Sequence, residues 1–336
     1  MRQIHTIDAI YTHTEGEPTC IVTGGIVYPA GSDILAKRRF LEENYDWLRC
    51  ALMQEPRGHK DMYGVFVTPP STPGMHAGTI WMNGSEFMHT CGHGTIATSM
   101  ALVATGLVPA DEGITEVRFE TTAGPVSADV AVGPAGVEWS RYRNVPTFMV
   151  REGVEIEVPD VGAIKADIVF SGNFFALIDW HGRSPKIRPE NGSVFARIGV
   201  AARQRLRELV PVQHPLFPHI NAISTITFYH EPTHAGARYR CAHVFGDGQV
   251  DRSPGGAGTA AMLAMLESRG QIKLGETVLA EGILGSGTFE GCLIEATTVA
   301  STRAVVPQIK GRANIVGHGR WLIDRADPVG KGFLIG

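Results

Sequence analysis

The chain has 336 residues, of which 43% are hydrophobic and 19% charged, and its formal net charge at pH 7 is −4. This composition is that of a globular protein with room for two domains, each burying its own core. The small negative charge and the lack of a basic tract argue against binding to nucleic acid or to a membrane surface. No apolar run reaches the roughly 18 residues that would span a membrane. His5 and Asp8 interrupt the amino terminus before a signal-peptide core, so we expect a cytoplasmic protein.

Strand-like and helix-like segments follow one another along the chain. Segments rich in β-branched or aromatic residues and bounded by Gly or Pro predict strands at 25–31, 64–70, 78–84, 117–140, 166–180 and 224–230. Apolar periodicity predicts helices at 34–53, 94–108, 194–210 and 258–270. Few helices among many strands indicate an α+β or mixed α/β fold. A polar stretch at 141–155 is the best candidate for a domain boundary.

One pattern occurs twice. The segment that begins at Cys91 and the segment that begins at Gly255 both read x-Gly-x-Gly-Thr, and each leads into an apolar helix that stops at a glycine, Gly106 or Gly270. Chance similarity between two glycine-rich helix starts is one interpretation. The strand-like sequence before both copies favours the other, a duplicated domain in which each half offers one helix start to a shared cleft.

The two helix starts suit the binding of an anion. A helix start leaves several backbone N–H groups unpaired and carries about half a positive charge, so two of them would hold a carboxylate or a phosphate. Cys91 stands just before the first start, where the helix dipole is expected to lower the pKa of a thiol and to make it a base or a nucleophile. The alternative is a small buried cysteine without function. The neighbouring glycines and His93 favour the functional interpretation.

Asp251 precedes the second helix start within the sequence Asp-Arg-Ser-Pro. This sequence is also an ordinary helix beginning, with Ser or Asp as the cap and Pro in the first turn. In a functional interpretation, Asp251 holds the ammonium group of a substrate whose carboxylate lies on the helix starts.

The remaining signals give little support to a metal centre. The five cysteines form no C-x-x-C pair and are odd in number, and the histidines show no H-E-x-x-H spacing, so neither a disulfide framework nor a zinc site is expected. The cysteines are Cys20, Cys50, Cys91, Cys241 and Cys292.

Nearly the whole chain resembles the proline racemase superfamily, which contains proline racemases, 4-hydroxyproline 2-epimerases and trans-3-hydroxy-L-proline dehydratases. The resemblance rests on the segments HTEGEPT, EPRGHKDMYG, MHTCGHGTIA, SGNFFALID, DRSPGGAGTAA, EGILGSGTFEG and PQIKGRANIVG. It implies two similar α/β domains of the diaminopimelate-epimerase type, each with a sheet wrapped around a central helix and with the active site in the interdomain cleft. It also implies that neither a metal nor a cofactor takes part. The domains expected are residues 1–150 with 315–336, and residues 151–314.

The resemblance also assigns roles to single residues. It implies that Cys91 is the base that acts on the substrate α-carbon. The substrate contacts that it implies are Gly92, His93, Asp251, Gly256 and Ala257.

Gly255 departs from the pattern of the family. Racemases and epimerases of the family usually have a second Cys there, and dehydratases a Thr, while Ala257 also replaces a usual Thr. Inversion of a carbon needs proton-carrying groups on both of its faces, and a glycine offers none. The position of the second base is therefore vacant.

Three functions are compatible with these residues, and all three involve an imino acid. The preferred one is a trans-3-hydroxy-L-proline dehydratase that gives pyrroline-2-carboxylate, because one base can start that reaction. The second is a 4-hydroxyproline 2-epimerase or proline racemase with a second proton donor other than residue 255. The third is a catalytically silent protein that binds imino acids. The resemblance suggests a homodimer.

Overall fold

The computed structural model describes residues 4–26 and 31–335. Contacts between residues divide the chain into two compact units. The first contains residues 1–90, 94–140 and 312–336, and the second contains residues 91–93 and 141–311. The domain boundaries expected from the sequence, 1–150 with 315–336 and 151–314, stay a prediction.

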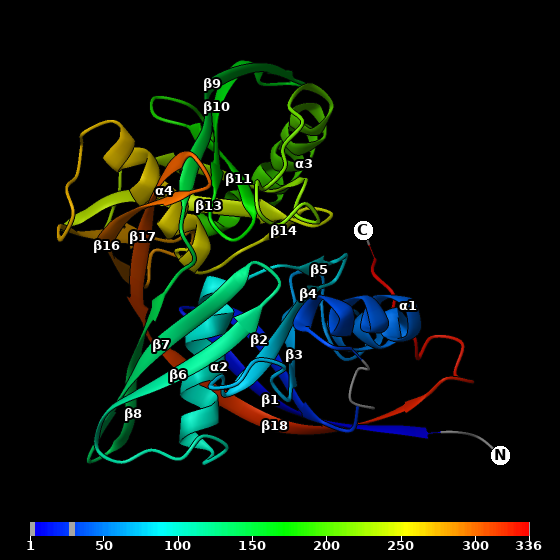
Figure 1. Ribbon diagram of the computed structural model, residues 1–336. Helices are drawn as coiled ribbons and strands as arrows, with labels where there is room; N and C mark the ends of the chain where they lie inside the picture. Colours follow the sequence, from blue (N-terminus) through cyan, green and yellow to red (C-terminus); the bar gives the residue numbers. More distant parts are fainter. Residues whose placement is uncertain (1–3, 27–30, 336) are drawn as a thin grey trace. The chain divides into compact units, whose positions relative to one another are not determined.

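The first unit is a mixed sheet with two helices (Figure 1). In it β1 pairs with β18 and β2, β2 runs parallel to β3, β3 pairs with β4, β4 pairs with β5 and runs parallel to β6, and β6 pairs with β7. Its elements are β1 (Ile4–Thr14), β2 (Glu17–Gly24), α1 (Ile34–Met53), β3 (Tyr63–Thr68), β4 (Ala77–Asn83), β5 (Phe87–Met88), α2 (Gly92–Ala104), β6 (Gly113–Thr121), β7 (Gly124–Gly133), β8 (Gly136–Arg143) and β18 (Ala313–Asp324). The first two residues of α2 and the last three of β8 are counted in the second unit.

The second unit repeats this topology. In it β9 pairs with β10, β10 with β11, β11 runs parallel to β12, β12 pairs with β13, β13 pairs with the two-residue β14 and runs parallel to β15, and β15 and β17 both pair with β16. Its elements are β9 (Phe148–Val158), β10 (Gly162–Phe170), β11 (Phe174–Asp179), the short helix Pro189–Asn191, α3 (Gly192–Leu209), β12 (Ile223–His230), β13 (Ala237–Phe245), β14 (Gln249–Val250), α4 (Gly256–Ser268), β15 (Thr277–Glu281), β16 (Thr288–Val299) and β17 (Thr302–Gly311).

The order of strands and helices confirms the duplication predicted from the repeated glycine pattern. In each unit one helix connects the first parallel pair of strands, and a second helix, preceded by a two-residue strand, connects the next parallel pair. The second helices are α2 and α4, which carry the two glycine patterns.

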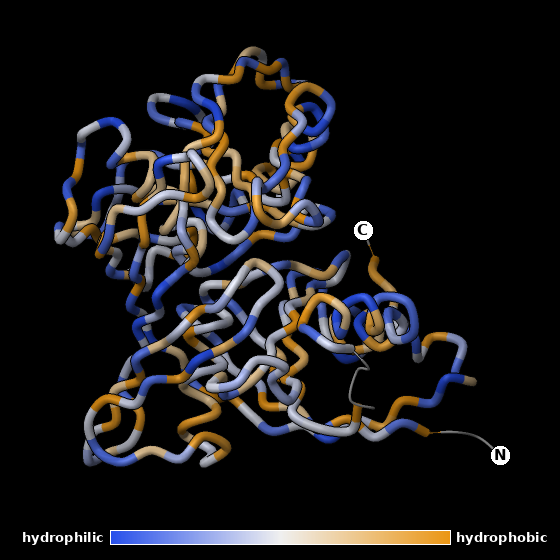
Figure 2. The backbone as a smooth tube through the Cα atoms, in the orientation of Figure 1, coloured by the Kyte–Doolittle hydropathy of each residue, from blue (hydrophilic) through white to orange (hydrophobic). Residues whose placement is uncertain are grey.

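The two kinds of helix differ in their surfaces. Residues 92–103 of α2 and 256–266 of α4 are buried throughout, as expected for helices that are apolar on every side. Helix α4 packs against β9, β10, β16 and β17 (Figure 1). Along α1 and α3 the tube alternates between hydrophilic and hydrophobic residues (Figure 2), and only one face of each is buried. The sheets therefore enclose α2 and α4, and α1 and α3 lie on the outside.

The four helices and most of the strands predicted from the sequence are confirmed. The exception is the strand expected at 25–31, because β2 ends at Gly24 and Gly25 and Ile26 form a bend. Residues 27–30 of that prediction lie outside the described residues. Among the described residues, no helix has the length and apolarity needed to cross a membrane.

Candidate active site

The start of α2 carries the cysteine and histidine that the sequence singled out. Cys91, Gly92 and His93 belong by their contacts to the second unit, although the rest of α2 belongs to the first. Cys91 is 5% exposed and His93 is 4% exposed. The sulfur of Cys91 lies 3.5 Å from each ring nitrogen of His93. A thiol and an imidazole at this distance can exchange a proton.

The start of α4 is built by a turn that begins at Asp251. One carboxylate oxygen of Asp251 accepts a hydrogen bond from the Ser253 backbone N–H at 2.7 Å, and Oγ of Ser253 accepts one from the Gly255 N–H at 3.0 Å. The other oxygen of Asp251 lies 3.6 Å from Nδ1 of His93. Asp251 therefore shapes the start of α4 and also faces the start of α2.

The two helix starts meet backbone to backbone. A Cβ atom added to Gly92 would lie 2.4 Å from the Ala257 nitrogen, and one added to Gly256 would lie 2.7 Å from the Gly92 Cα. Both positions therefore require glycine. The backbone N–H groups of two helix starts are brought close together, which is the arrangement that attracts an anion.

Two side chains hold the first turn of α4 in place. The hydroxyl of Ser171 donates to the Ala257 carbonyl at 2.9 Å, and the Asn144 side-chain amide donates to the Ser171 oxygen at 2.9 Å. All three residues are buried. The second helix start is thus fixed by hydrogen bonds, which favours a preorganised site.

Burial dominates the electrostatics of the site. It lowers the pKa of His93 below its ordinary value of 6.5, although the charge of Asp251 acts in the opposite direction. His93 is therefore uncharged at neutral pH, with its carboxylate neighbour close enough to stabilise the ring when it takes up a proton.

The side chain of His243 fills the space beside Gly255. A Cβ atom added to Gly255 would lie 2.2 Å from Nε2 of His243, and one added to Gly258 would lie 2.1 Å from Cε1 of the same ring. Gly255 also has a φ of 72°, a conformation that side chains rarely adopt. The volume that a side chain of residue 255 would take is occupied by an imidazole from β13.

The sequence interpretation missed His243, although a signal was present. Cys241-Ala242-His243 repeats the spacing of Cys91-Gly92-His93, and in both cases the two side chains touch. The sulfur of Cys241 lies 3.3 Å from Nε2 of His243. The repeat was concealed because the second copy belongs to a strand and the first to a helix start.

Tyr142 is the other residue that the sequence did not indicate. Its side chain is buried, and a Cβ atom added to Gly92 would lie 2.4 Å from its hydroxyl oxygen. That oxygen has no hydrogen-bond partner among the described residues. Burial raises the pKa of Tyr142 well above its ordinary value, and the nearby Cys91 acts in the same direction, so the hydroxyl keeps its proton.

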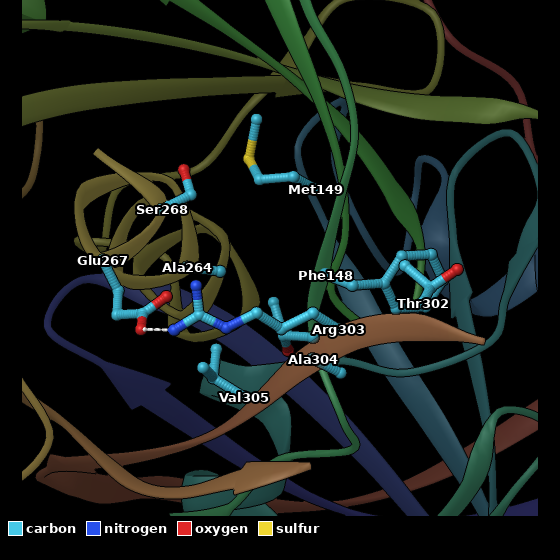
Figure 3. Close-up of a pocket in the computed structure, with 10 residues that line it drawn as sticks. Phe148, Met149, Ala264, Glu267, Ser268, Thr302, Arg303, Ala304 and Val305 are labelled. Carbon is cyan, nitrogen blue, oxygen red and sulfur yellow. Dashed lines mark hydrogen bonds and ion pairs between the residues drawn. The ribbon is translucent and has the colours of Figure 1, made fainter. Parts of the chain in front are cut away.

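A hollow in the second unit lies elsewhere. It is lined by the carboxyl end of α4 and by β9 and β17, and an ion pair between Glu267 and Arg303 crosses it (Figure 3). Its volume of about 180 Å³ is below the roughly 300–1,000 Å³ of ordinary ligand pockets. None of the predicted site residues lines it. Within residues 4–26 and 31–335, no three His, Cys, Asp or Glu side chains are grouped so as to hold a metal ion.

A thiol and an imidazole at one glycine-rich helix start, with a carboxylate at a second, define a site suited to acid–base chemistry on a small anion. Comparison with known proteins gives the family. The profile of the family described as proline racemase matches residues 9–334. This chain belongs to the proline racemase family.

Three curated relatives cover the full length of the chain. It is 55% identical over 336 residues to a 4-hydroxyproline 2-epimerase of Cereibacter sphaeroides. It is 43% identical over 335 residues to a proline racemase of Clostridioides difficile and 35% identical over 335 residues to a trans-3-hydroxy-L-proline dehydratase of Azospirillum brasilense. In all three cases the match covers 100% of both chains.

A solved structure gives the same result for the fold. A hydroxyproline epimerase from Agrobacterium vitis, with bound trans-4-hydroxy-L-proline, superposes with a TM-score of 0.94 and 29% identity. The match covers 100% of this chain and 96% of that one. The fold class expected from the sequence, mixed α/β with two similar halves of the diaminopimelate-epimerase type, is confirmed.

Proposed function

We propose that this protein is a 4-hydroxyproline 2-epimerase, which inverts the α-carbon of 4-hydroxyproline. The observation that carries the proposal is the 55% identity, over the full length of both chains, to a protein of that name. The solved structure of a hydroxyproline epimerase with its imino acid supports the same substrate class. The dehydratase that we preferred from the sequence is supported by a relative that is 35% identical, so the epimerase is the better conclusion.

The proposed chemistry begins at Cys91. Its thiolate removes the α-proton, and the electron pair of the broken C–H bond is delocalised into the substrate carboxylate. The backbone N–H groups at Gly92, Gly256 and Ala257 bind that carboxylate and stabilise the charge that develops on it. Asp251 pairs with the substrate ammonium group. His93, 3.5 Å from the Cys91 sulfur, accepts the thiol proton when the thiolate forms.

The reaction uses only side chains and backbone donors, so no cofactor enters it. Inversion is complete when a proton reaches the α-carbon on the face opposite Cys91. Gly255 cannot supply that proton. The homodimer and the cytoplasmic location stay predictions.

Proton NMR in D₂O tests the proposal with trans-4-hydroxy-L-proline, L-proline and trans-3-hydroxy-L-proline as separate substrates. We expect trans-4-hydroxy-L-proline to be converted to cis-4-hydroxy-D-proline, with deuterium entering the α-position. A parallel sample of the Cys91→Ser variant serves as the control for contaminating enzymes. Consumption of trans-3-hydroxy-L-proline to a pyrroline, without inversion of the 4-hydroxy substrate, would contradict the proposal and restore the dehydratase.

A further inference from the structure

The imidazole of His243 occupies the position of the missing second base. The ideal Cβ of residue 255 would lie 2.2 Å from Nε2, 2.4 Å from Cδ2 and 3.0 Å from Cε1 of the ring. Real Cβ atoms do not approach other atoms so closely, so the ring and any side chain at residue 255 exclude each other. His243 is itself 2% exposed, which means that the ring is built into the site.

Two fixed groups orient the ring. Nε2 of His243 donates to the Pro254 carbonyl at 2.8 Å, and Nδ1 lies 2.8 Å from the hydroxyl of Thr227. A carbonyl can only accept, so the neutral ring carries its proton on Nε2 and Nδ1 accepts from the hydroxyl. Pro254 directly precedes Gly255, so the ring proton is directed at the start of α4, where the substrate carboxylate would bind. A ring proton is held beside the vacant position 255.

The groups that face the ring favour proton exchange. Asp251 is near enough for its charge to raise the pKa of His243, while burial lowers it more strongly, so the ring is neutral at neutral pH. The charge of Asp251 acts to raise the pKa of His93 as well, so both imidazoles lie in the field of one carboxylate, although burial lowers both pKa values more strongly. Burial raises the pKa of Cys241 well above its ordinary value, so that thiol keeps its proton and cannot replace the ring as the base.

From this geometry we propose that His243 is the second acid–base residue of the epimerase, acting on the face of the α-carbon opposite Cys91. The inference rests on the proposed function. In each working state, Cys91 and His243 together hold one exchangeable proton, either on the thiol or on the imidazolium. The group without the proton removes the α-proton, and the group with the proton replaces it on the other face.

The proton balance can be written for both directions. With the Cys91 thiol and a neutral His243 whose proton has moved to Nδ1, where the Thr227 hydroxyl accepts it, Nε2 takes the α-proton as the C–H bond breaks, and the thiol S–H bond breaks to form the new C–H bond. The products are imidazolium and thiolate. That pair is the starting state for the reverse reaction, in which the thiolate takes the proton and the imidazolium returns one. No oxidant or other reactant is needed.

The test compares two variants with the parent enzyme. His243→Gln introduces an amide that can donate to the Pro254 carbonyl but cannot take up or supply the α-proton of the substrate. The double variant His243→Ala with Gly255→Cys removes the ring and places a thiol in the vacated volume. Each protein is assayed for inversion of trans-4-hydroxy-L-proline and for exchange of its α-proton with D₂O. Binding of pyrrole-2-carboxylate and circular dichroism report whether each protein is folded.

We expect His243→Gln to invert the substrate about 100-fold or more slowly, in line with the loss of one acid–base group. Exchange without inversion should persist in the isomer whose α-proton faces Cys91, and pyrrole-2-carboxylate should still bind. The double variant should invert at least about tenfold faster than His243→Ala alone, a rescue that a merely structural histidine would not give.

Inversion by His243→Gln within threefold of the parent would overturn the inference while leaving the epimerase intact. A parent enzyme that inverts none of the substrates would instead contradict the proposed function and the role of His243 with it. If neither variant folds, the parent in D₂O still tests whether a second base acts, which the inference requires. Two bases give a product with α-deuterium and leave unreacted substrate with α-protium, whereas return of protium to the product would exclude a second base.

Discussion

The two glycine-rich helix starts differ in the element that supplies the side chains beside them. At the start of α2, Cys91 and His93 come from the helix start itself. At the start of α4, Gly255 and Gly258 have no side chains, and the ring that fills their space comes from His243 on β13. The topology around the helices is the same in both units, so the difference lies only in which element supplies the side chain.

This difference shows that a side chain from a neighbouring strand can fill the volume that glycines leave at a helix start. Gly255 and His243 are twelve positions apart in the sequence and would be examined separately in a comparison of single positions. In the structure they are two halves of one packing arrangement, because the ring and a side chain at residue 255 cannot coexist.

The largest expected effect breaks the α2 side of this comparison. Cys91→Ala removes the proposed base, so epimerisation should fall by about 10²- to 10⁴-fold, the usual contribution of an acid–base group. Steady-state polarimetry measures the loss. Cys292→Ala, which removes a thiol from β16, is the matched control and should retain parental activity. Parental turnover in Cys91→Ala would show that another group removes the α-proton.

The next effect concerns the α4 side. Gly255→Ala and Gly270→Ala both place a side chain at a positive φ, 72° and 67°, which costs about 1–2 kcal/mol in each case. Only Gly255→Ala also drives a Cβ into the ring of His243, whereas the space around Gly270 is open. The free energy of unfolding from urea titrations should therefore fall by about 1–3 kcal/mol more for Gly255→Ala. Equal losses would mean that the ring moves aside freely.

The smallest effect is on the pH dependence of stability. Burial lowers the pKa of both His93 and His243 below 6.5, so the unfolded chain binds more protons than the folded one as the pH falls. Their contribution is complete above about pH 6.5 and is lost as the pH falls toward the folded-state values.

Urea titrations between pH 7 and 5 measure this slope. His93→Gln and His243→Gln should each reduce it by up to one proton, about 1.4 kcal/mol per pH unit. A slope that is unchanged in both variants would argue against two neutral, buried rings.

The sequence was most informative where a periodic pattern fixes the structure. Helix α1 forms at the predicted residues 34–53, because an apolar stripe and the Asp33 cap, which accepts from the Ala36 N–H at 2.8 Å, agree on its start. Helices α2 and α4 each begin two residues before the prediction, since glycines give no periodic signal. The duplicated glycine pattern also identified the two central helices.

The site was predictable only in part. Cys91, His93 and Asp251 were selected from local motifs, and the structure brings them together, while their catalytic roles stay predictions. His243 and Tyr142 could not be found in this way, because they reach the helix starts from β13 and β8. Such contacts depend on strand register, which no short motif encodes.

The pairing of β18 with β1 has a consequence for the order of folding during synthesis. β1 is made before the second unit, and its partner, residues 313–324, is made after it. The second unit can therefore complete its sheet while one edge of β1 still lacks its hydrogen-bonding partner. A ribosome that stops after residue 311 would release a chain whose second unit is whole and whose first strand offers an open edge to other chains.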